Sequence, residues 1–199
     1  RLDILVGTQM VVKGLDFDKV SLVGILDADG LLAFADFRVN ERAFQLMEQV
    51  SGRAGRKDQQ GKVMIQATQV NHPVLQFVQQ HDYKAMFAEE LKKRKEFSYP
   101  PFSRIIHLTF KHKFKEVVER AALAYTDTLR ARYGNYIVGP AEPVIGRIRN
   151  QYLMELLLKL PRDGKTITQC KKDLLEQVAI LHQHKSFRSV TIVADVDAV

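Results

Sequence analysis

The chain has 199 residues, 46% of them hydrophobic, which is enough for one large or two small packed domains. Thirty Lys and Arg residues against twenty-three Asp and Glu give a net charge of +7, which favours anionic partners such as nucleic acid. The single cysteine, Cys170, excludes an internal disulfide and a zinc site built from several cysteines, and its helical surroundings predict a core residue. The sequence has no charged-then-apolar leader and no apolar run of roughly 18 residues, so we expect a cytoplasmic protein without a membrane partner.

The first third of the chain alternates strand and helix patterns. Apolar runs of strand length occur at residues 2–6, 20–29 and 61–67, and an amphipathic helical pattern occurs at residues 40–50. This order favours a mostly parallel α/β sheet covered on both faces, whose ligands gather at the carboxyl ends of strands, near Gly7 and Asp27. Because Arg1 stands almost inside the first strand, we expect the chain to be a piece of a longer protein.

Two helices are predicted between residues 71 and 97, the first capped by Asn71 with Pro73 in its opening turn. The second ends in a basic run, residues 92–95, which is favourable at a helix C-terminus and is usually solvated. Pro100 and Pro101 then break the helix. We therefore place a domain boundary between residues 98 and 99.

The remaining residues read as a β-α-β-β-α-β unit. The expected strands are 104–112, 136–149, 152–161 and 189–196, and the expected helices are 115–133, ending at Gly134, and 166–184. Two helices on one face of a four-stranded antiparallel sheet form the ferredoxin-like arrangement. The predicted fold class is therefore α/β at residues 1–98, followed by an α+β, ferredoxin-like domain at residues 99–199.

The octapeptide "QVSGRAGR", residues 49–56, is a candidate phosphate-binding segment. Arg53 and Arg56 are two planar cationic groups on a backbone that glycine makes pliable, which suits a triphosphate. For this octapeptide alone, a basic helix C-terminus capped by Gly55 explains the residues equally well.

A longer pattern resembles a known family. The stretch "GTQMVVKGLDF" at residues 7–17, followed about thirty residues later by "QVSGRAGR", resembles motifs V and VI of superfamily 2 helicases. The further stretches "LDAD" and, above all, "YPPFSR" are similar to the bacterial primosomal replication-restart helicases, the primosomal protein N-prime family. The resemblance covers essentially the whole chain and implies that residues 1–98 are the C-terminal part of a second RecA-like helicase lobe.

The resemblance also implies roles for individual residues. By matching motif V, Thr8 would contact a DNA phosphate, while Gly14 and Asp16 would approach the ATP ribose. By matching motif VI, Gln49, Arg53 and Arg56 would act in catalysis, with the two arginines reaching the ATP phosphates. These residues complete a site that another lobe would mainly build.

The chain alone is not expected to hydrolyse ATP. It contains no Gly-x-x-x-x-Gly-Lys-Ser/Thr loop and no Asp-Glu-x-His box that could hold Mg²⁺. Family members also carry zinc-binding cysteines ahead of motif V, so zinc is expected upstream of these residues, and no metal site is expected within them.

In the family, the C-terminal domain helps to bind branched DNA and meets single-stranded-DNA-binding protein. Candidate phosphate contacts in this domain are Arg147 and Arg149, which would point the same way on a strand, with Tyr152 as a stacking surface. A solvated hairpin with a tyrosine at the core edge is the alternative. The family further implies forked or single-stranded DNA, primosome proteins and the machinery that loads the replicative helicase as partners, at replication forks in the bacterial nucleoid.

Two functional hypotheses remain open at the level of sequence. The chain belongs to an ATP-dependent 3′-to-5′ DNA helicase that restarts replication at stalled forks, or it is a non-catalytic nucleic-acid or protein adaptor. A third pattern, Asp27 and Asp29 at a strand end, is also found in haloacid-dehalogenase-type phosphotransferases. The later lysine and aspartate pair of such a site have no clear counterpart here.

Overall fold

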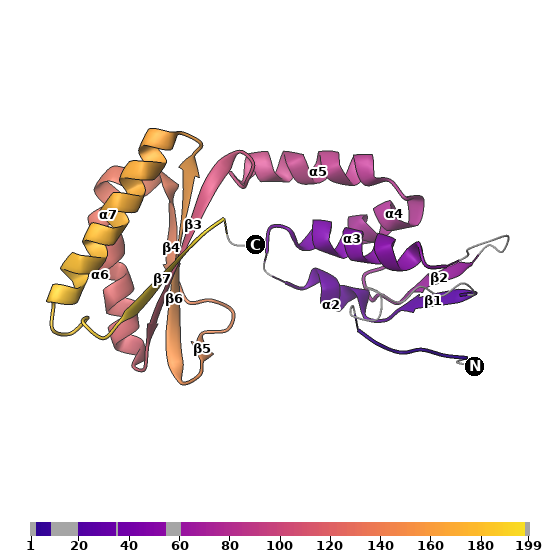
Figure 1. Cartoon of the computed structure of the whole chain (residues 1–199), viewed down its shortest axis with the longest axis horizontal. Helices are drawn as coiled ribbons and strands as arrows, with labels where there is room; N and C mark the ends of the chain where they lie inside the picture. Colours follow the sequence, from indigo (N-terminus) through magenta and orange to yellow (C-terminus); the bar gives the residue numbers. More distant parts are fainter. Residues whose placement is uncertain (1–2, 9–19, 35, 55–60, 198–199) are drawn as a thin grey trace. The chain divides into compact units, whose positions relative to one another are not determined.

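The structure is a computed structural model and describes residues 3–8, 20–34, 36–54 and 61–197 (Figure 1). The chain divides into two compact units, Arg1–Lys93 and Arg94–Val199, here called the N-terminal and C-terminal units. In the part of the chain that the structure describes, no helix is long and apolar enough to cross a membrane.

Among its described residues, the N-terminal unit contains a short parallel sheet, three helices and most of a fourth. Strand β1 (Leu22–Ile25) pairs in parallel with β2 (Lys62–Ile65), as the sequence predicted. The helices are α2 (Ala28–Leu32), α3 (Val39–Ser51), α4 (Pro73–Gln80) and α5 (Tyr83–Glu96). Their shared core includes Ile25, Phe44, Met47 and Met86, so the predicted apolar face of α3 is confirmed.

The prediction of a buried strand at residues 2–6 is wrong for the described residues 3–6. These residues form no strand, and the side chains of Ile4 and Val6 are 83% and 82% exposed. The sheet is also open on one face, where Leu22 and Met64 are exposed. A strand is stable only when it is paired, and β1 and β2 pair only with each other among the described residues.

Two predicted boundaries in this unit need correction. The strand expected at residues 20–29 ends at Ile25, because Asp27 caps α2 by accepting a hydrogen bond from the Gly30 amide at 3.1 Å. Helix α4 is capped by His72, whose ring Nδ1 accepts from the Val74 amide at 3.3 Å, and not by Asn71. Pro73 occupies the opening turn as predicted.

The C-terminal unit has the predicted element order β-α-β-β-α-β, except that the strand predicted at residues 136–149 is divided into two strands, β4 and β5. Its elements are β3 (Ser103–His112), α6 (Lys115–Tyr133), the 3-10 turn η1 (Gly134–Tyr136), β4 (Ile137–Ala141), β5 (Arg147–Ile148), β6 (Gln151–Pro161), α7 (Gly164–Gln183) and β7 (Thr191–Val196). The antiparallel sheet has the order β4-β6-β3-β7, and β5 adds a short fifth strand that pairs with β6. Helix α7 starts two residues before the predicted position because Asp163 caps it.

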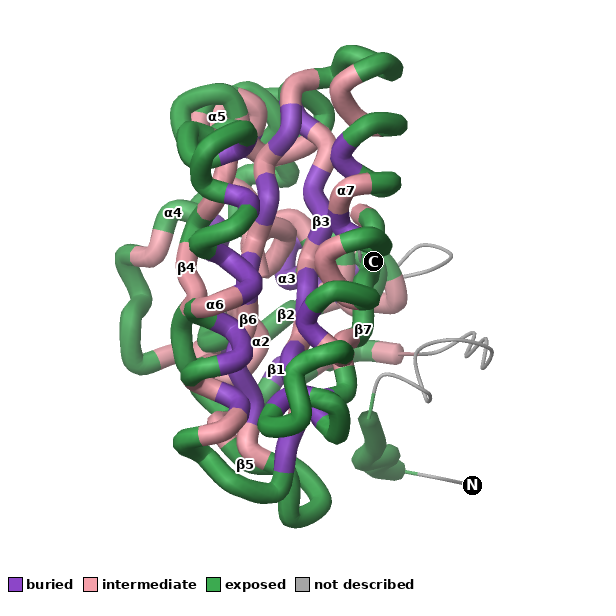
Figure 2. The backbone as a smooth tube through the Cα atoms, turned by 90° about the vertical axis from the view of Figure 1, so that its left-hand side faces the viewer, coloured by how far each residue is buried: buried purple, intermediate pink, exposed green. Residues whose placement is uncertain are grey.

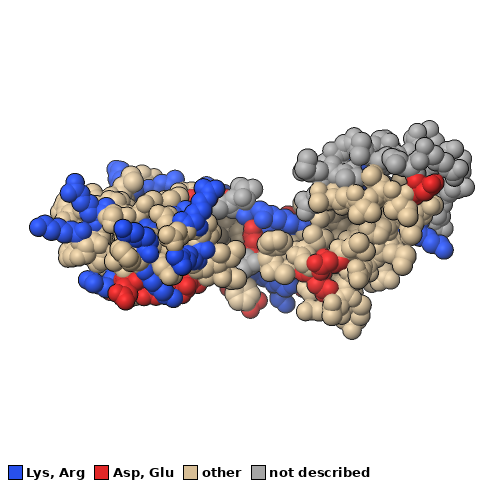
Figure 3. Space-filling model, turned by 90° about the horizontal axis from the view of Figure 1, so that it is seen from below, with Lys and Arg blue, Asp and Glu red and all other residues tan. Residues whose placement is uncertain are grey.

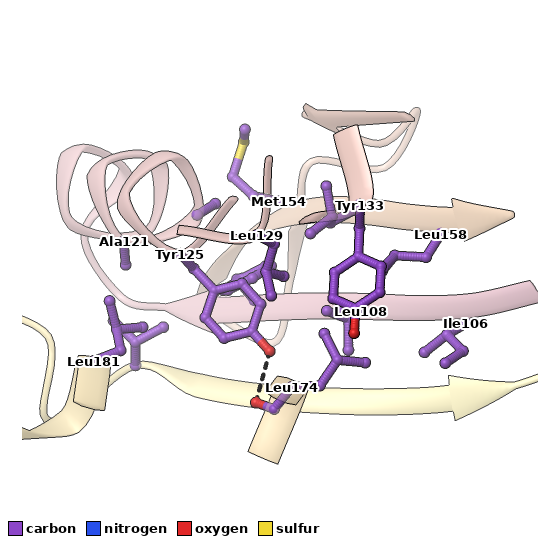
Figure 4. Packing of buried hydrophobic residues seen from close by; sticks show 14 of the residues in the cluster. Ile106, Leu108, Ala121, Tyr125, Leu129, Tyr133, Met154, Leu158, Leu174 and Leu181 are labelled. Atoms are coloured by element: carbon purple, nitrogen blue, oxygen red, sulfur yellow. Dashed lines mark hydrogen bonds between the residues drawn. The ribbon is translucent and has the colours of Figure 1, made fainter. Parts of the chain in front are cut away.

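The core of the C-terminal unit lies between this sheet and helices α6 and α7 (Figures 1 and 2). Alternate residues of β3 point into it, and their register partners on β6 do the same, as for Leu108 opposite Leu156. The ring of Phe110 packs edge-on against Tyr125 with centroids 5.3 Å apart. The Tyr125 hydroxyl donates to the Leu174 carbonyl at 2.9 Å, which ties α6 to α7 (Figure 4). Cys170 is buried in the same core, as predicted.

A polar cluster closes the contact between α6 and α7 at the surface. The Asp173 carboxylate accepts hydrogen bonds from the Tyr133 hydroxyl at 2.7 Å and from the Arg132 guanidinium at 2.6 Å. These two donors hold the pKa of Asp173 below its ordinary value of 3.8. Because the folded carboxylate resists protonation, its contribution to stability is present at neutral pH and is lost as the pH falls through the folded pKa.

We therefore expect Asp173→Asn to reduce the acid sensitivity of the C-terminal unit. Urea unfolding followed by tyrosine fluorescence should give a wild-type midpoint that falls between about pH 5 and pH 3, and a smaller fall in the variant. Five of the six tyrosines lie in residues 94–199 and the chain has no tryptophan, so this signal reports mainly on the C-terminal unit. Asp195→Asn, at an exposed position on β7, is the control, and an equal change in both variants would contradict the role of Asp173.

Candidate functional site

The motif VI segment begins at the C-terminal end of α3. Gln49 is exposed on the last turn, and Arg53, half-buried, follows one turn later, its amide donating to the Val50 carbonyl at 3.0 Å. The structure therefore brings Gln49 and Arg53 to the same end of one helix. Arg56, Gly14 and Asp16 lie outside the described residues, and so does Gly55, whereas the observed cap of α3 is Gly52. Thr8 is described and exposed, outside any regular element.

The end of α3 is fixed by contacts with the two helices that follow it in the chain. Met47 is fully buried, and the Glu48 carboxylate lies 3.0 Å from the His81 ring at the end of α4. At the other end of α3, the Asn40 side-chain amide donates to the buried Glu90 of α5 at 2.9 Å.

The C-terminus of a helix is the negative end of its dipole and does not by itself attract a phosphate. Arginine side chains must therefore supply the positive charge there.

Asp27 and Asp29 have structural roles in the described residues. Asp27 caps α2, and Asp29 accepts hydrogen bonds from the Thr68 and Gln69 amides at 2.6 and 3.1 Å. The two amides lower the pKa of Asp29. These contacts hold the segments that follow β1 and β2 together. A phosphotransferase nucleophile would need a free carboxylate, so the geometry favours the structural explanation for this pair.

The second candidate segment is a protruding loop and hairpin in the C-terminal unit, residues 142–152, which we call the arm. Strand β5 pairs with the start of β6, with Arg147 opposite Tyr152 (Figures 1 and 2). Arg149 and Asn150 form the two-residue turn between them, with φ values of 48° and 63°, as in a type I′ turn. The expectation that Arg147 and Arg149 share one strand face is therefore wrong, because Arg149 lies in the turn.

The two arginines of the arm have different surroundings. The Arg147 guanidinium lies over the Tyr152 ring, 4.8 Å from its centroid, and bonds to the Asn150 side chain. Arg147 therefore occupies one face of the Tyr152 ring, and Tyr152 also packs against the core, which leaves little of the ring for stacking on a base. Arg149 is exposed and forms no ion pair or side-chain hydrogen bond with the described residues. It is free to contact an anion.

The base of the arm is fixed to the rest of the unit. Lys115, at the start of α6, donates to the Glu142 carboxylate at 2.6 Å, and this contact raises the pKa of Lys115. Glu142 fills the space beside Gly146, where an added Cβ would meet its carboxylate. The Gly146 carbonyl accepts a hydrogen bond from the Leu153 amide at 2.9 Å.

The excess positive charge of the chain belongs mainly to its second half. Residues 99–199 contain 16 Lys and Arg against ten Asp and Glu, while residues 1–98 contain 14 against 13. Lys and Arg side chains are spread over the face of the C-terminal unit seen in Figure 3. A surface of this kind attracts a polyanion.

Comparison with known proteins decides the family. Residues 95–199 match the family described as "Primosomal protein N C-terminal domain". The chain belongs to this PriA family. Relatives named "Replication restart protein PriA" include those of Synechocystis (42% identical, covering 83% of this chain and 20% of the relative), Bacillus subtilis (40%, covering 87% and 22%) and Treponema pallidum (36%, covering 100% and 30%). The chain thus spans only 20% to 30% of these relatives, and the predicted family resemblance is confirmed.

Two basic side chains at the end of β6 hold the "YPPFSR" segment of this PriA chain, residues 99–104, and the residues just before it. Lys159 donates to the Phe97 carbonyl at 2.7 Å, and its ammonium lies 3.7 Å from the centroid of the Tyr99 ring. Burial lowers the pKa of Lys159. Arg162 donates to the Pro101 carbonyl at 3.2 Å. Sequence reasoning missed Lys159, although a lone lysine among the leucines of β6 was a usable signal.

The basic run at the end of α5 is partly engaged within the chain. Lys93 pairs with Glu89 at 2.7 Å, and Arg94 donates to the Pro100 carbonyl at 3.2 Å. Lys92 and Lys95 remain exposed. The prediction of a solvated helix end therefore holds for Lys92 and Lys95, whereas Lys93 and Arg94 have structural contacts.

Proposed function

We propose that this PriA-family chain supplies two parts of an ATP-dependent 3′-to-5′ DNA helicase that recognises stalled or branched forks and restarts replication by primosome assembly. Residues 1–98 would be the C-terminal part of the second RecA-like lobe, and residues 99–199 the C-terminal domain. Because the chain has no phosphate-binding loop of its own, we expect it to hydrolyse no ATP alone.

The architecture of each unit supports this assignment. The parallel pairing of β1 and β2, with helices α2 and α3 following β1, fits a piece of a RecA-like lobe. The sheet order β4-β6-β3-β7, with α6 and α7 packed against a single core, fits the ferredoxin-like arrangement.

At the ATP site, we assign phosphate contact to Arg53 and Arg56, and ribose contact to Gly14 and Asp16. Gln49 would lie beside the same phosphates, since it shares the end of α3 with Arg53. The described residues fit a supporting role, because Gln49 is exposed and Arg53 is half-buried at the end of a rigidly packed helix. ATP with Mg²⁺, held mainly by the other lobe, supplies the reactive phosphate. These arginines would stabilise negative charge that develops on it.

At the DNA site, we assign phosphate contact to Thr8, Arg147 and Arg149. The observation that carries this proposal is the position of Arg149, exposed and unpaired among the described residues, in the hairpin turn of the arm and in the more basic half of the chain. Forked or single-stranded DNA, single-stranded-DNA-binding protein, other primosome proteins and the replicative-helicase loading machinery would be the partners, in the bacterial cytoplasm at replication forks.

Salt-dependent DNA binding tests the DNA site. Fluorescence anisotropy of the 199-residue chain with forked and with blunt duplex DNA should show tighter binding to the fork. The log–log salt slope should become shallower by about 0.9 in Arg149→Ala and by about twice that in Arg147→Ala/Arg149→Ala. Each phosphate contact that the protein makes releases counterions from the DNA, so fewer are released when a contact is lost.

The control removes the same charge elsewhere. Lys171→Ala/Lys172→Ala changes two exposed lysines on α7 and should leave most of the slope unchanged. An equal change in the control would mean general attraction to the basic domain, and absence of binding by the wild-type chain would refute DNA recognition by these residues.

A further inference from the structure

The arm is apolar as well as basic, and Val144 and Ile145, in the loop before β5, are here called the apolar tip. Val144 is 92% exposed, Ile145 is 64% exposed and Ile148 is 49% exposed. Three such residues within five positions are unusual on a polar surface, and the described residues leave about half or more of each uncovered. We propose that Val144 and Ile145 enter DNA at a branch point, between bases whose stacking is already weakened there, while Arg147 and Arg149 hold the flanking phosphates. This inference rests on the proposed DNA site and deepens it.

The arm is already shaped for insertion. The Lys115–Glu142 ion pair, the packing of Glu142 against Gly146 and the bond from the Leu153 amide to the Gly146 carbonyl fix its base. The pairing of β5 with β6 fixes the other side. A tip that is ordered before binding loses little conformational entropy when it inserts, so its apolar contacts are available for affinity.

The turn at the end of the hairpin carries a second sign of function. Arg149 has a φ of 48°, a left-handed conformation that glycine or asparagine adopts more easily than arginine. An arginine held there is strained, and strained residues cluster at sites where their side chains are used. The turn holds Arg149 in the same arm as Val144 and Ile145, four positions along the chain from Ile145.

Branched DNA is the occupant that this chemistry fits best. Arginines complement phosphates, and β-branched or aliphatic side chains that wedge between base steps are a recurring means of binding deformed DNA. Opening a continuous duplex step costs stacking energy, whereas a branch point has already lost part of its stacking. The apolar tip should therefore add affinity for the fork and little for blunt duplex, which makes it a determinant of substrate choice.

The test uses a forked DNA with 2-aminopurine at the branch point and a second fork with 2-aminopurine inside one duplex arm. The wild-type chain should raise the fluorescence of the first probe, because insertion unstacks it, and leave the second unchanged. In Val144→Ser/Ile145→Ser this increase should disappear, and the preference for fork over duplex should fall about tenfold. The salt slope should stay at the wild-type value, since both arginines remain.

Leu175→Ser/Ile180→Ser is the matched control, because it removes two exposed apolar side chains of α7, which are 74% and 47% exposed. It should behave as wild type. The proposal is overturned if the wild-type chain leaves the branch probe unchanged, or if the arm variant binds the fork as tightly as wild type or loses fork and duplex affinity equally. In those cases a shallower slope in Arg147→Ala/Arg149→Ala would still support the DNA site, whereas no binding by the wild-type chain would refute both.

Discussion

We expect Phe110→Ala to lower the free energy of unfolding of the C-terminal unit by about 3–5 kcal/mol. The Phe110 side chain is fully buried, lies near the C-terminal end of β3 and packs edge-on against Tyr125. Removing the ring loses the free energy gained by burying it and leaves a cavity. Because β3 is paired with β6 on one side and β7 on the other, the sheet cannot easily move to close that cavity. Urea unfolding followed by tyrosine fluorescence measures the loss directly.

Phe102→Ala is the matched control for this substitution. Phe102 lies next to the start of β3, and its side chain is 40% exposed. We expect its loss to cost about 1 kcal/mol or less, as for most surface changes. Equal destabilisation by the two substitutions would contradict the assignment of Phe110 to the centre of the core.

The elements of the C-terminal unit were predictable because their signals are local. The alternation of Ile106, Leu108 and Phe110 sets the buried face of β3, and Gly134 follows directly on the last residue of α6, Tyr133. Each signal depends on residues close in sequence, so the order of strands and helices could be derived without knowing their partners.

What the sequence did not reveal depends on distant partners. A strand at residues 2–6 needs a neighbour to pair with, and hydrophobicity alone cannot show whether one is present. The role of Asp29 depends on the Thr68 and Gln69 amides, which lie about forty positions further along the chain. In the sequence, Asp27 and Asp29 therefore resemble a catalytic pair, although the contacts of Asp29 are structural.

The candidate DNA site was predictable in its residues but not in its geometry. The charges of Arg147 and Arg149 indicate that both can contact phosphate, yet their spacing suggests that both lie on one face of a strand. The hairpin turn lacks the Asn-Gly or Asp-Gly pair that usually marks a type I′ turn, so nothing local placed Arg149 in it. The apolar tip is not evident from the sequence for a similar reason, since Val144 and Ile145 have the pattern of strand residues and only the structure shows that they are exposed.

In a full-length PriA relative, alanine at the position of Arg56 should lower DNA-stimulated ATP hydrolysis by about 10³-fold or more and leave DNA affinity nearly unchanged. Alanine at the position of Arg53 should act in the same direction. An arginine on the γ-phosphate stabilises charge that develops only during phosphoryl transfer, so its loss lowers the rate more than it lowers nucleotide binding. Steady-state ATPase assays with saturating single-stranded DNA, together with anisotropy binding to the same DNA, separate the two effects.

Alanine at the position of Arg42 is the control, because this arginine lies on the same helix, α3, and pairs with Asp36 at 2.9 Å, away from the motif VI end. Hydrolysis should stay close to wild type in that variant, since only a partly exposed ion pair is lost. Unchanged hydrolysis in the Arg56 variant would defeat the assignment of motif VI. The N-terminal unit would then have to be interpreted as a catalytically silent scaffold, and the adaptor hypothesis would explain the chain better than the motor. Loss of hydrolysis at Arg56 with retention at Arg42 would instead assign phosphate sensing to motif VI, the segment that begins at the end of α3, where the buried Met47 anchors the helix.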